Sequence, residues 1–243
     1  MTSEHIVKSY DDELNRLNRT IVEMGGLAEA QLQSAIRALI ERNSELAASV
    51  IEEDDKVDAL NFDVDQFAVQ LLALRQPMAE DLRCIVASLK ISSDLERIAD
   101  YATNVAKRVI AMDEYPTVKL AAGISRMAAL VTPMIKDVLD AYVARDAERA
   151  IEVWNRDIEV DDMYLSLFRE LLTYMMEDPR NITPCTHLLF MAKNIERIGD
   201  HVTNIAETVY FLVHGKRLRE HRPKLEEGDH TASTLAAHGK PEK

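Results

Sequence analysis

Glycine and cysteine are scarce in this chain of 243 residues, and each shortage excludes a class of protein. The seven glycines do not occur at the spacings that a Walker A loop or a GxGxxG turn requires. Two common phosphate-binding motifs are therefore absent. Two cysteines, Cys84 and Cys185, cannot supply a disulfide framework or a thiolate zinc site by themselves. We therefore expect both cysteines to be reduced residues of the core.

Long apolar runs and excess positive charge are also missing. No window approaches the roughly 18 uninterrupted apolar residues of a membrane span, and the opening segment MTSEHIVKSYDDELNR is acidic where a secretory signal is basic and then apolar. These features predict a cytoplasmic protein. Lys and Arg number 29 against 42 Asp and Glu, which gives a net charge of −13, so nucleic acid is not an expected partner.

The residues that are abundant predict an all-α protein. Apolar residues recur at three- and four-residue steps through most of the chain, and proline or turn clusters separate the periodic segments. Pro77 is expected to be the first residue of its helix, and Gly215 is expected to end the last helix. The expected helices cover residues 5–42, 45–75, 78–112, 117–144, 147–177 and 183–214.

The sequence repeats itself. The segment SDLERIADYATNVAKRV (93–109) matches KNIERIGDHVTNIAETV (193–209), whereas upstream matches such as Asp54 with Asp157 have a separation three residues longer. The change of register falls between the second and third helix of each unit, where loop length is free to vary. We therefore expect two tandem three-helix bundles and a flexible tail. Their expected limits are 1–114 for the first bundle, 115–220 for the second and 221–243 for the tail.

Each unit carries two pairs of carboxylates at i,i+4 spacing, one on its second helix and one on its third. The eight residues are Asp54, Asp58, Glu96, Asp100, Asp157, Asp161, Glu196 and Asp200. Two anions on one helical face destabilise a helix unless a cation lies between them. Acid pairs at this spacing are no more frequent here than chance gives, so only their matched placement indicates a site. Solvated acidic faces, preserved by duplication, are the alternative.

The helical periodicity predicts where these carboxylates lie. The apolar residues of the third helix centre on the side opposite Glu96, so Glu96 and Asp100 are expected outside the core, while Asp54 and Asp58 flank the apolar stripe of the second helix. The two pairs are expected to meet in a surface groove and share one or more metal ions. Because every ligand is an oxygen, Mg²⁺, Mn²⁺, Ca²⁺ or Fe³⁺ would suit the set better than Zn²⁺ or Cu²⁺. Each bundle is thus expected to carry an open acidic metal patch.

Polar neighbours of the acid pairs have more ordinary interpretations. Asn104 and Asn204, one turn beyond the aspartates, are candidates for neutral metal ligands or for simple hydrogen bonding. Arg97 and Arg197 are expected to pair with nearby carboxylates, with anion or partner docking as the alternative. His201 projects away from Asp200 and is expected to be a surface histidine rather than a ligand.

Several motifs, in order along nearly the whole chain, resemble the PhoU family of phosphate-signalling regulators. They are VEMGGLAEAQL (22–32), RQPMAEDLR (75–83), LERIAD (95–100), TYMMEDPRNI (173–182) and IERIGD (195–200). The resemblance implies two three-helix bundles whose E(D)xxxD motifs bind surface clusters of metal, with Mg, Mn or Fe the expected ions, through the eight acids above. One departure is Ala99 where the second unit has Gly199, which is expected to change close approach locally.

The resemblance also implies a function without catalysis. Such a protein is a cytoplasmic adaptor that negatively regulates the phosphate regulon, acting between the ATPase subunit of the phosphate ABC transporter and a sensor histidine kinase. It would associate peripherally with the membrane through these partners and form a homodimer. Two alternatives remain open from the residues: a metal-dependent hydrolase or phosphatase that uses a bound water, and a plain helical scaffold whose acids only solvate its surface.

Overall fold

The computed structural model describes residues 2–115 and 121–218, with side chains described from Asp12 onward. These residues form six long α-helices and one short 3₁₀ turn. The elements are α1 (Thr2–Glu41), α2 (Ser44–Arg75), α3 (Ala79–Ala111), α4 (Ala121–Ala144), α5 (Ala147–Glu177), η1 (Pro179–Asn181) and α6 (Ile182–His214). The prediction of an all-α fold with two tandem three-helix bundles is confirmed. The expected helix start at 117 and the tail at 221–243 lie outside the described residues.

The first turn of each bundle has the same geometry. Arg42 and Arg145 adopt left-handed backbone conformations with φ of 53° and 51°, and the next residue of each turn, Asn43 or Asp146, is extended and caps the following helix. Asn43 accepts a hydrogen bond from the Leu46 amide at 2.9 Å, and Asp146 accepts one from the Arg149 amide at 3.0 Å. The repeat seen in the sequence is thus a repeat of local structure.

Of the two helix ends predicted from a proline or a glycine, one is confirmed and the other is wrong. Gly215 ends α6 in the left-handed conformation and donates its amide to the Phe211 carbonyl at 2.8 Å, as predicted. Pro77 is not the first residue of α3, because α3 begins at Ala79 with Met78 extended before it. The physical reason lies one residue earlier: Gln76 ends α2 in the left-handed conformation, so the chain reverses through Pro77 and Met78 before a new helix can start.

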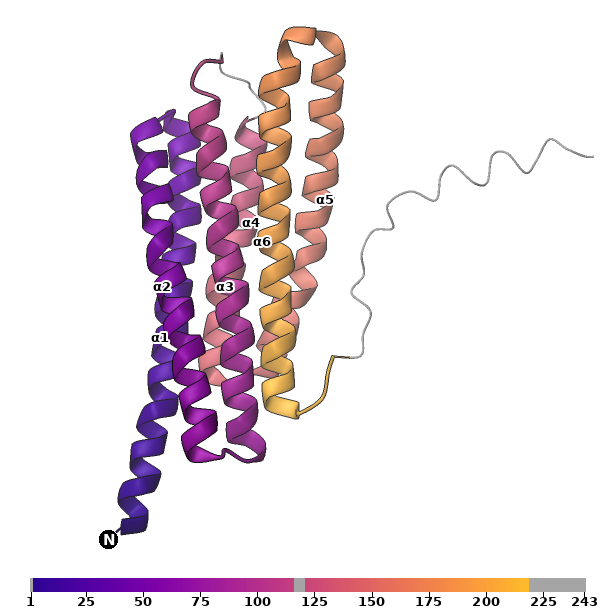
Figure 1. The fold of residues 1–243 in the computed structure, drawn as a ribbon. Helices are drawn as coiled ribbons and strands as arrows, with labels where there is room; N and C mark the ends of the chain where they lie inside the picture. Colours follow the sequence, from indigo (N-terminus) through magenta and orange to yellow (C-terminus); the bar gives the residue numbers. More distant parts are fainter. Residues whose placement is uncertain (1, 116–120, 219–243) are drawn as a thin grey trace, which may run out of the picture.

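The helices α3 and α6 lie side by side at the centre of the molecule (Figure 1). The helix α3 packs on α1 and α2, α6 packs on α4 and α5, and α1 also contacts α4. One continuous cluster of buried apolar side chains runs through both bundles, and it includes the free cysteines Cys84 and Cys185, as expected. None of the helices, over the residues described, is long and apolar enough to cross a membrane.

Candidate functional site: two unequal sets of carboxylates

The first acidic set consists of Asp54 and Asp58 on α2 with Glu96 and Asp100 on α3. Packing of α2 against α3 brings the two predicted pairs into one electrostatic neighbourhood. Burial raises the pKa of the Asp54 carboxyl, and the charges of Asp100 and Asp58 raise it further. Burial also raises the pKa of Glu96, with added repulsion from Asp100, Asp58 and Asp54. The negative charges of this set therefore repel one another and add to the effect of burial on Asp54 and Glu96.

Cations and a hydroxyl group border the first set. Arg97 lies 3.5 Å from Oε2 of Glu96 and 3.3 Å from Oδ2 of Asp100, which confirms the interpretation of this arginine as a carboxylate partner. Its side chain is 56% exposed, so the pairing is solvent-screened and weak. The Thr103 hydroxyl and the Lys107 charge oppose the rise in the pKa of Asp54 without cancelling it. The net effect is a half-buried, under-compensated negative site.

The second acidic set consists of Asp157 and Asp161 on α5 with Glu196 and Asp200 on α6. It differs from the open acidic patch that the repeat predicts, because Asp157 is only 2% exposed and Glu196 only 9%. The expectation of a surface groove is wrong for these two residues. Two local features account for their burial: a lysine within the set and a glycine beside it.

Lys193 is a cation within the second set, and it pairs directly with Glu196. Its ammonium lies 2.8 Å from Glu196 and 5.1 Å from the centre of the Tyr164 ring. Burial alone would lower the pKa of Lys193, but the hydrogen bond and charge of Glu196 outweigh it and the pKa is raised. The corresponding residue of the first unit is Ser93, which has no charge. The two sets thus have carboxylates at matching positions, but only the second set has a lysine at this position to balance their negative charge.

Gly199 supplies the space that Asp157 needs against α6. A Cβ atom at Gly199 would lie 2.7 Å from Oδ1 of Asp157 and 3.5 Å from Val160. The first unit has Ala99 at the matching position, and its Asp54 is only half-buried. The change from alanine to glycine therefore alters how closely the neighbouring helix can approach, as expected. It leaves room for the Asp157 carboxylate in the interface between α5 and α6.

Replacing Gly199 with alanine is expected to destabilise the protein by about 1–2 kcal/mol. Alanine gains about 1 kcal/mol in helix propensity over glycine, but its methyl group must push a buried carboxylate away from a contact of 2.7 Å. Urea unfolding followed by circular dichroism would measure the change. The reciprocal variant Ala99→Gly is the control and should lose only about 1 kcal/mol. A stabilised Gly199→Ala variant would contradict this account of the burial of Asp157.

The donor chemistry of both sets suits a hard metal ion, but their present rotamers do not enclose one. Among the residues described, no three Asp, Glu, His or Cys side chains converge closely enough to hold a metal as placed. Mutual repulsion among the carboxylates of the first set is a physical reason for them to stand apart.

The contact between α3 and α6 holds polar residues that hydrogen-bond from one bundle to the other. His201 is not an isolated surface residue, because its Nδ1 lies 2.8 Å from Oδ1 of Asp94 across the two bundles. Asn204 donates to the same Asp94 oxygen at 3.4 Å. Arg197 donates to the Tyr101 hydroxyl at 3.2 Å and stacks near its ring. Sequence patterns missed Asp94, Tyr101 and Lys193, and only the serine-to-lysine difference between the repeats could have revealed the last.

Comparison with known proteins identifies the family. The model of the PhoU domain matches twice, at residues 21–109 and 124–209, once in each bundle. The phosphate-specific transport system accessory protein PhoU homolog of Caulobacter vibrioides (strain NA1000 / CB15N) is 52% identical over 225 residues, which are 92% of this chain and 98% of that protein. The homolog of the same name from Rhizobium meliloti is 50% identical over 239 residues, covering 98% and 99%.

Solved structures agree with the sequence relatives. The crystal structure of PhoU from Pseudomonas aeruginosa superposes with a TM-score of 0.83 at 40% identity, covering 85% of this chain and all of that one. The phosphate transport system regulatory protein PhoU from Streptococcus pneumoniae gives a TM-score of 0.81 at 27% identity, with coverage of 87% and 100%. With a family domain in each bundle and relatives matched over nearly their full length, this chain belongs to the PhoU family.

Proposed function

We propose that this protein is an accessory regulator of a phosphate-specific transport system. The observation that carries the proposal is near-complete alignment, at about half identity, with proteins named as accessory proteins of such a system. The internal duplication and the acidic positions are distributed along the aligned region rather than confined to one part of it. The role extends from these relatives to this chain because both bundles are present in full.

Within that role, the protein acts as a cytoplasmic adaptor and negative regulator. It contacts the ATPase subunit of the phosphate ABC transporter and a sensor histidine kinase, and reaches the membrane through them. It works as a homodimer and performs no catalysis of its own. The net charge of −13 supports protein partners over nucleic acid or anionic lipid, since either of those would be repelled.

The first acidic set serves this role as a cation-binding face. Asp54, Asp58, Glu96 and Asp100 would hold a hard divalent or trivalent ion such as Mg²⁺, Mn²⁺ or Fe³⁺. A bound ion supplies positive charge that neutralises the repelling carboxylates. The second set, through Asp157, Asp161, Glu196 and Asp200, would bind the same class of ion more weakly, because Lys193 already compensates Glu196. The exposed edge at Asp58 and Arg97 is then the part that a partner meets.

Co-purification from membranes tests the adaptor role. A tagged full-length chain, expressed in phosphate-replete cells, is expected to retain the transporter ATPase and the histidine kinase, identified by mass spectrometry. The variant Asp54→Asn/Glu96→Gln should retain less of both, because its acidic face lacks two ligands. The matched control is Glu148→Gln/Glu152→Gln, which removes the same charge from an exposed acid pair of α5 outside both sets.

The outcomes separate the proposal from its alternatives. Loss of both partners from the wild-type preparation, with the protein folded, would overturn the adaptor role. Hydrolysis of phosphate esters that stops on chelation would instead favour a metal-dependent phosphatase. Equal capture of both partners by wild type and the Asp54/Glu96 variant would support the adaptor role but show that these acids only solvate the surface and are not part of the docking face.

A further inference from the structure

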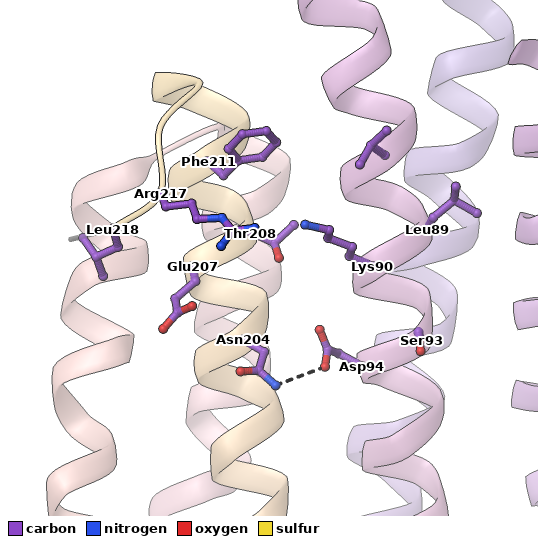
Figure 2. Close-up of a pocket in the computed structure, with 11 residues that line it drawn as sticks. Leu89, Lys90, Ser93, Asp94, Asn204, Glu207, Thr208, Phe211, Arg217 and Leu218 are labelled. Atoms are coloured by element: carbon purple, nitrogen blue, oxygen red, sulfur yellow. Dashed lines mark hydrogen bonds between the residues drawn. The ribbon is translucent and has the colours of Figure 1, made fainter. Parts of the chain in front are cut away.

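A groove of about 900 Å³ lies between α3 and α6, on a different part of these helices from the acidic sets (Figure 2). Apolar and polar side chains of both bundles line it, together with the segment that follows α6. Phe211 and Leu218 form part of its apolar wall, and Ser93 and Thr208 contribute hydroxyl groups. Its volume is in the range of sites for small organic ligands rather than for a bare ion.

Two cations extend into this groove from opposite sides. Lys90 reaches across from α3 toward Phe211, and its ammonium lies 5.6 Å from the centre of that ring. Arg217 reaches back from beyond α6 toward Thr208 (Figure 2). Within the described part of the chain, no ion pair involves either residue, in a protein with 42 acids against 29 bases. Two cations in one groove repel each other, and an anion bound between them would relieve that repulsion.

The acids that line the groove are already engaged elsewhere. Asp94 accepts from Asn204 at 3.4 Å and lies 2.8 Å from Nδ1 of His201. Glu207 accepts a hydrogen bond from the Trp154 indole at 3.1 Å and therefore faces α5. In Figure 2, Glu207 lies on the far side of α6 from Lys90. Among the described residues, neither carboxylate forms an ion pair with Lys90 or Arg217.

A third cation offsets the negative end of α6. Arg83 lies against Gly215: a Cβ atom added at this glycine would be 3.6 Å from Nη1 of the arginine. A cation at the C-terminus of a helix complements the partial negative charge of its last carbonyls. Arg83 therefore reduces the repulsion that the C-terminal carbonyls of α6 would exert on an anion nearby. Lys90 and Arg217 are then the two cations in the groove that can bind an anionic ligand.

We propose that this groove binds a phosphoryl group, with Lys90 and Arg217 as its charged contacts. The guanidinium presents a planar fork of N–H donors and the ammonium three more, a supply that matches the several oxygens of a phosphate better than the two of a carboxylate. Thr208 and Ser93 add hydroxyl donors, and Phe211 offers an aromatic face for an organic substituent. The site stands independently of the proposed protein partners, because it rests on the groove alone.

Isothermal titration of the full-length protein at low ionic strength tests the site. Inorganic phosphate and phenyl phosphate are the two probes, and sodium sulfate measures the contribution of ionic strength. Lys90→Gln and Arg217→Gln are each expected to weaken phosphate binding about tenfold, as loss of one charge-assisted contact would. Lys136→Gln and Arg126→Gln, exposed residues of α4, are the matched controls and should bind as wild type does. Lys90→Arg should restore most of the affinity.

The two probes distinguish the source of the phosphoryl group. Tighter binding of phenyl phosphate than of inorganic phosphate, lost in Phe211→Ala, would support an organic phosphomonoester as the ligand. Equal binding of the two would support free phosphate. The proposal fails if wild type binds neither probe, if sulfate binds as well as phosphate, or if the groove and control variants lose affinity equally. Circular dichroism of each variant establishes that it is folded before titration.

Discussion

Replacing Asp54 with asparagine and Glu96 with glutamine is expected to stabilise the metal-free protein and to remove most of its stabilisation by divalent cations. Both wild-type carboxyls have raised pKa values because of burial and neighbouring negative charge. Removing two mutually repelling pairs should raise the free energy of unfolding by roughly 0.5–1 kcal/mol. This corresponds to a rise in Tm of about 1–4 °C for a domain of this size. A cation at a hundredfold excess over its Kd contributes about 2.7 kcal/mol, roughly 5–10 °C in wild type alone.

The pH dependence of the same variant gives a second readout. A carboxyl whose pKa is raised by folding stabilises the folded state below its ordinary pKa, 3.8 for Asp54 and 4.5 for Glu96, and loses that contribution as pH rises through the raised value. The advantage of the variant in the metal-free state should therefore be absent at low pH and develop toward neutrality. Differential scanning fluorimetry with and without Mn²⁺ across this range measures both effects.

A matched charge change elsewhere controls for net charge. Glu148→Gln/Glu152→Gln removes two exposed acids of α5 and should leave the metal-induced rise in Tm intact. If the Asp54/Glu96 variant keeps the full metal response, the first acidic set is not the main cation site of this protein.

Substitution of Lys193 by serine is the second change with a large expected effect. It gives the second acidic set the residue found in the first unit and leaves Glu196, 9% exposed, without its ammonium partner at 2.8 Å. Breaking a buried ion pair costs about 3–5 kcal/mol, but the Lys193 side chain is 39% exposed, so a loss of about 1–2 kcal/mol is expected after solvent screening. The Tm of the metal-free protein should fall by several degrees, which thermal unfolding at neutral pH would measure.

The same variant should gain a response to metal. Without its lysine, the second set resembles the first. The rise in Tm that Mn²⁺ causes should therefore be larger in Lys193→Ser than in wild type. Lys193→Met separates charge from packing, because it keeps an aliphatic stem over Tyr164. Lys136→Ser, at an exposed position of α4, controls for helix propensity. A Lys193→Ser variant as stable as wild type, with unchanged metal response, would show that the ammonium does not compensate this set.

The sequence contained enough information for the helices and for the first acidic set, but not for the docking of the bundles. Helix limits were predictable because local signals such as the Asn43 cap and Gly215 act within one turn. The first acidic set was predictable because i,i+4 spacing fixes relative direction on a helix. Burial of Asp157 and Glu196 was not, since it depends on the absence of one methyl group at Gly199 and on one ammonium at Lys193.

Residues between the bundles were the least predictable part of the molecule. His201 meets Asp94, and Arg197 meets Tyr101, only because α3 and α6 pack at a particular angle and register. Helical periodicity determines which way a side chain projects from its own axis but not which helix lies there. Arg97, whose partners are on its own helix, was correctly interpreted; its counterpart Arg197 also interacts with the charges of Glu196 and Asp200, but its hydrogen bond to Tyr101 on the other bundle was not predicted.

The central pairing of α3 with α6 bears on how such a molecule arose. Side chains of both halves contribute to one shared interior, and each half covers apolar surface of the other along these two helices. A shorter ancestral chain with a single copy of the unit would have left that surface open to water, and the simplest way to cover it is a second identical chain turned to meet the first. Once the two copies are joined in one chain, each is free to differ from the other, as Ser93 and Lys193 do at matching positions.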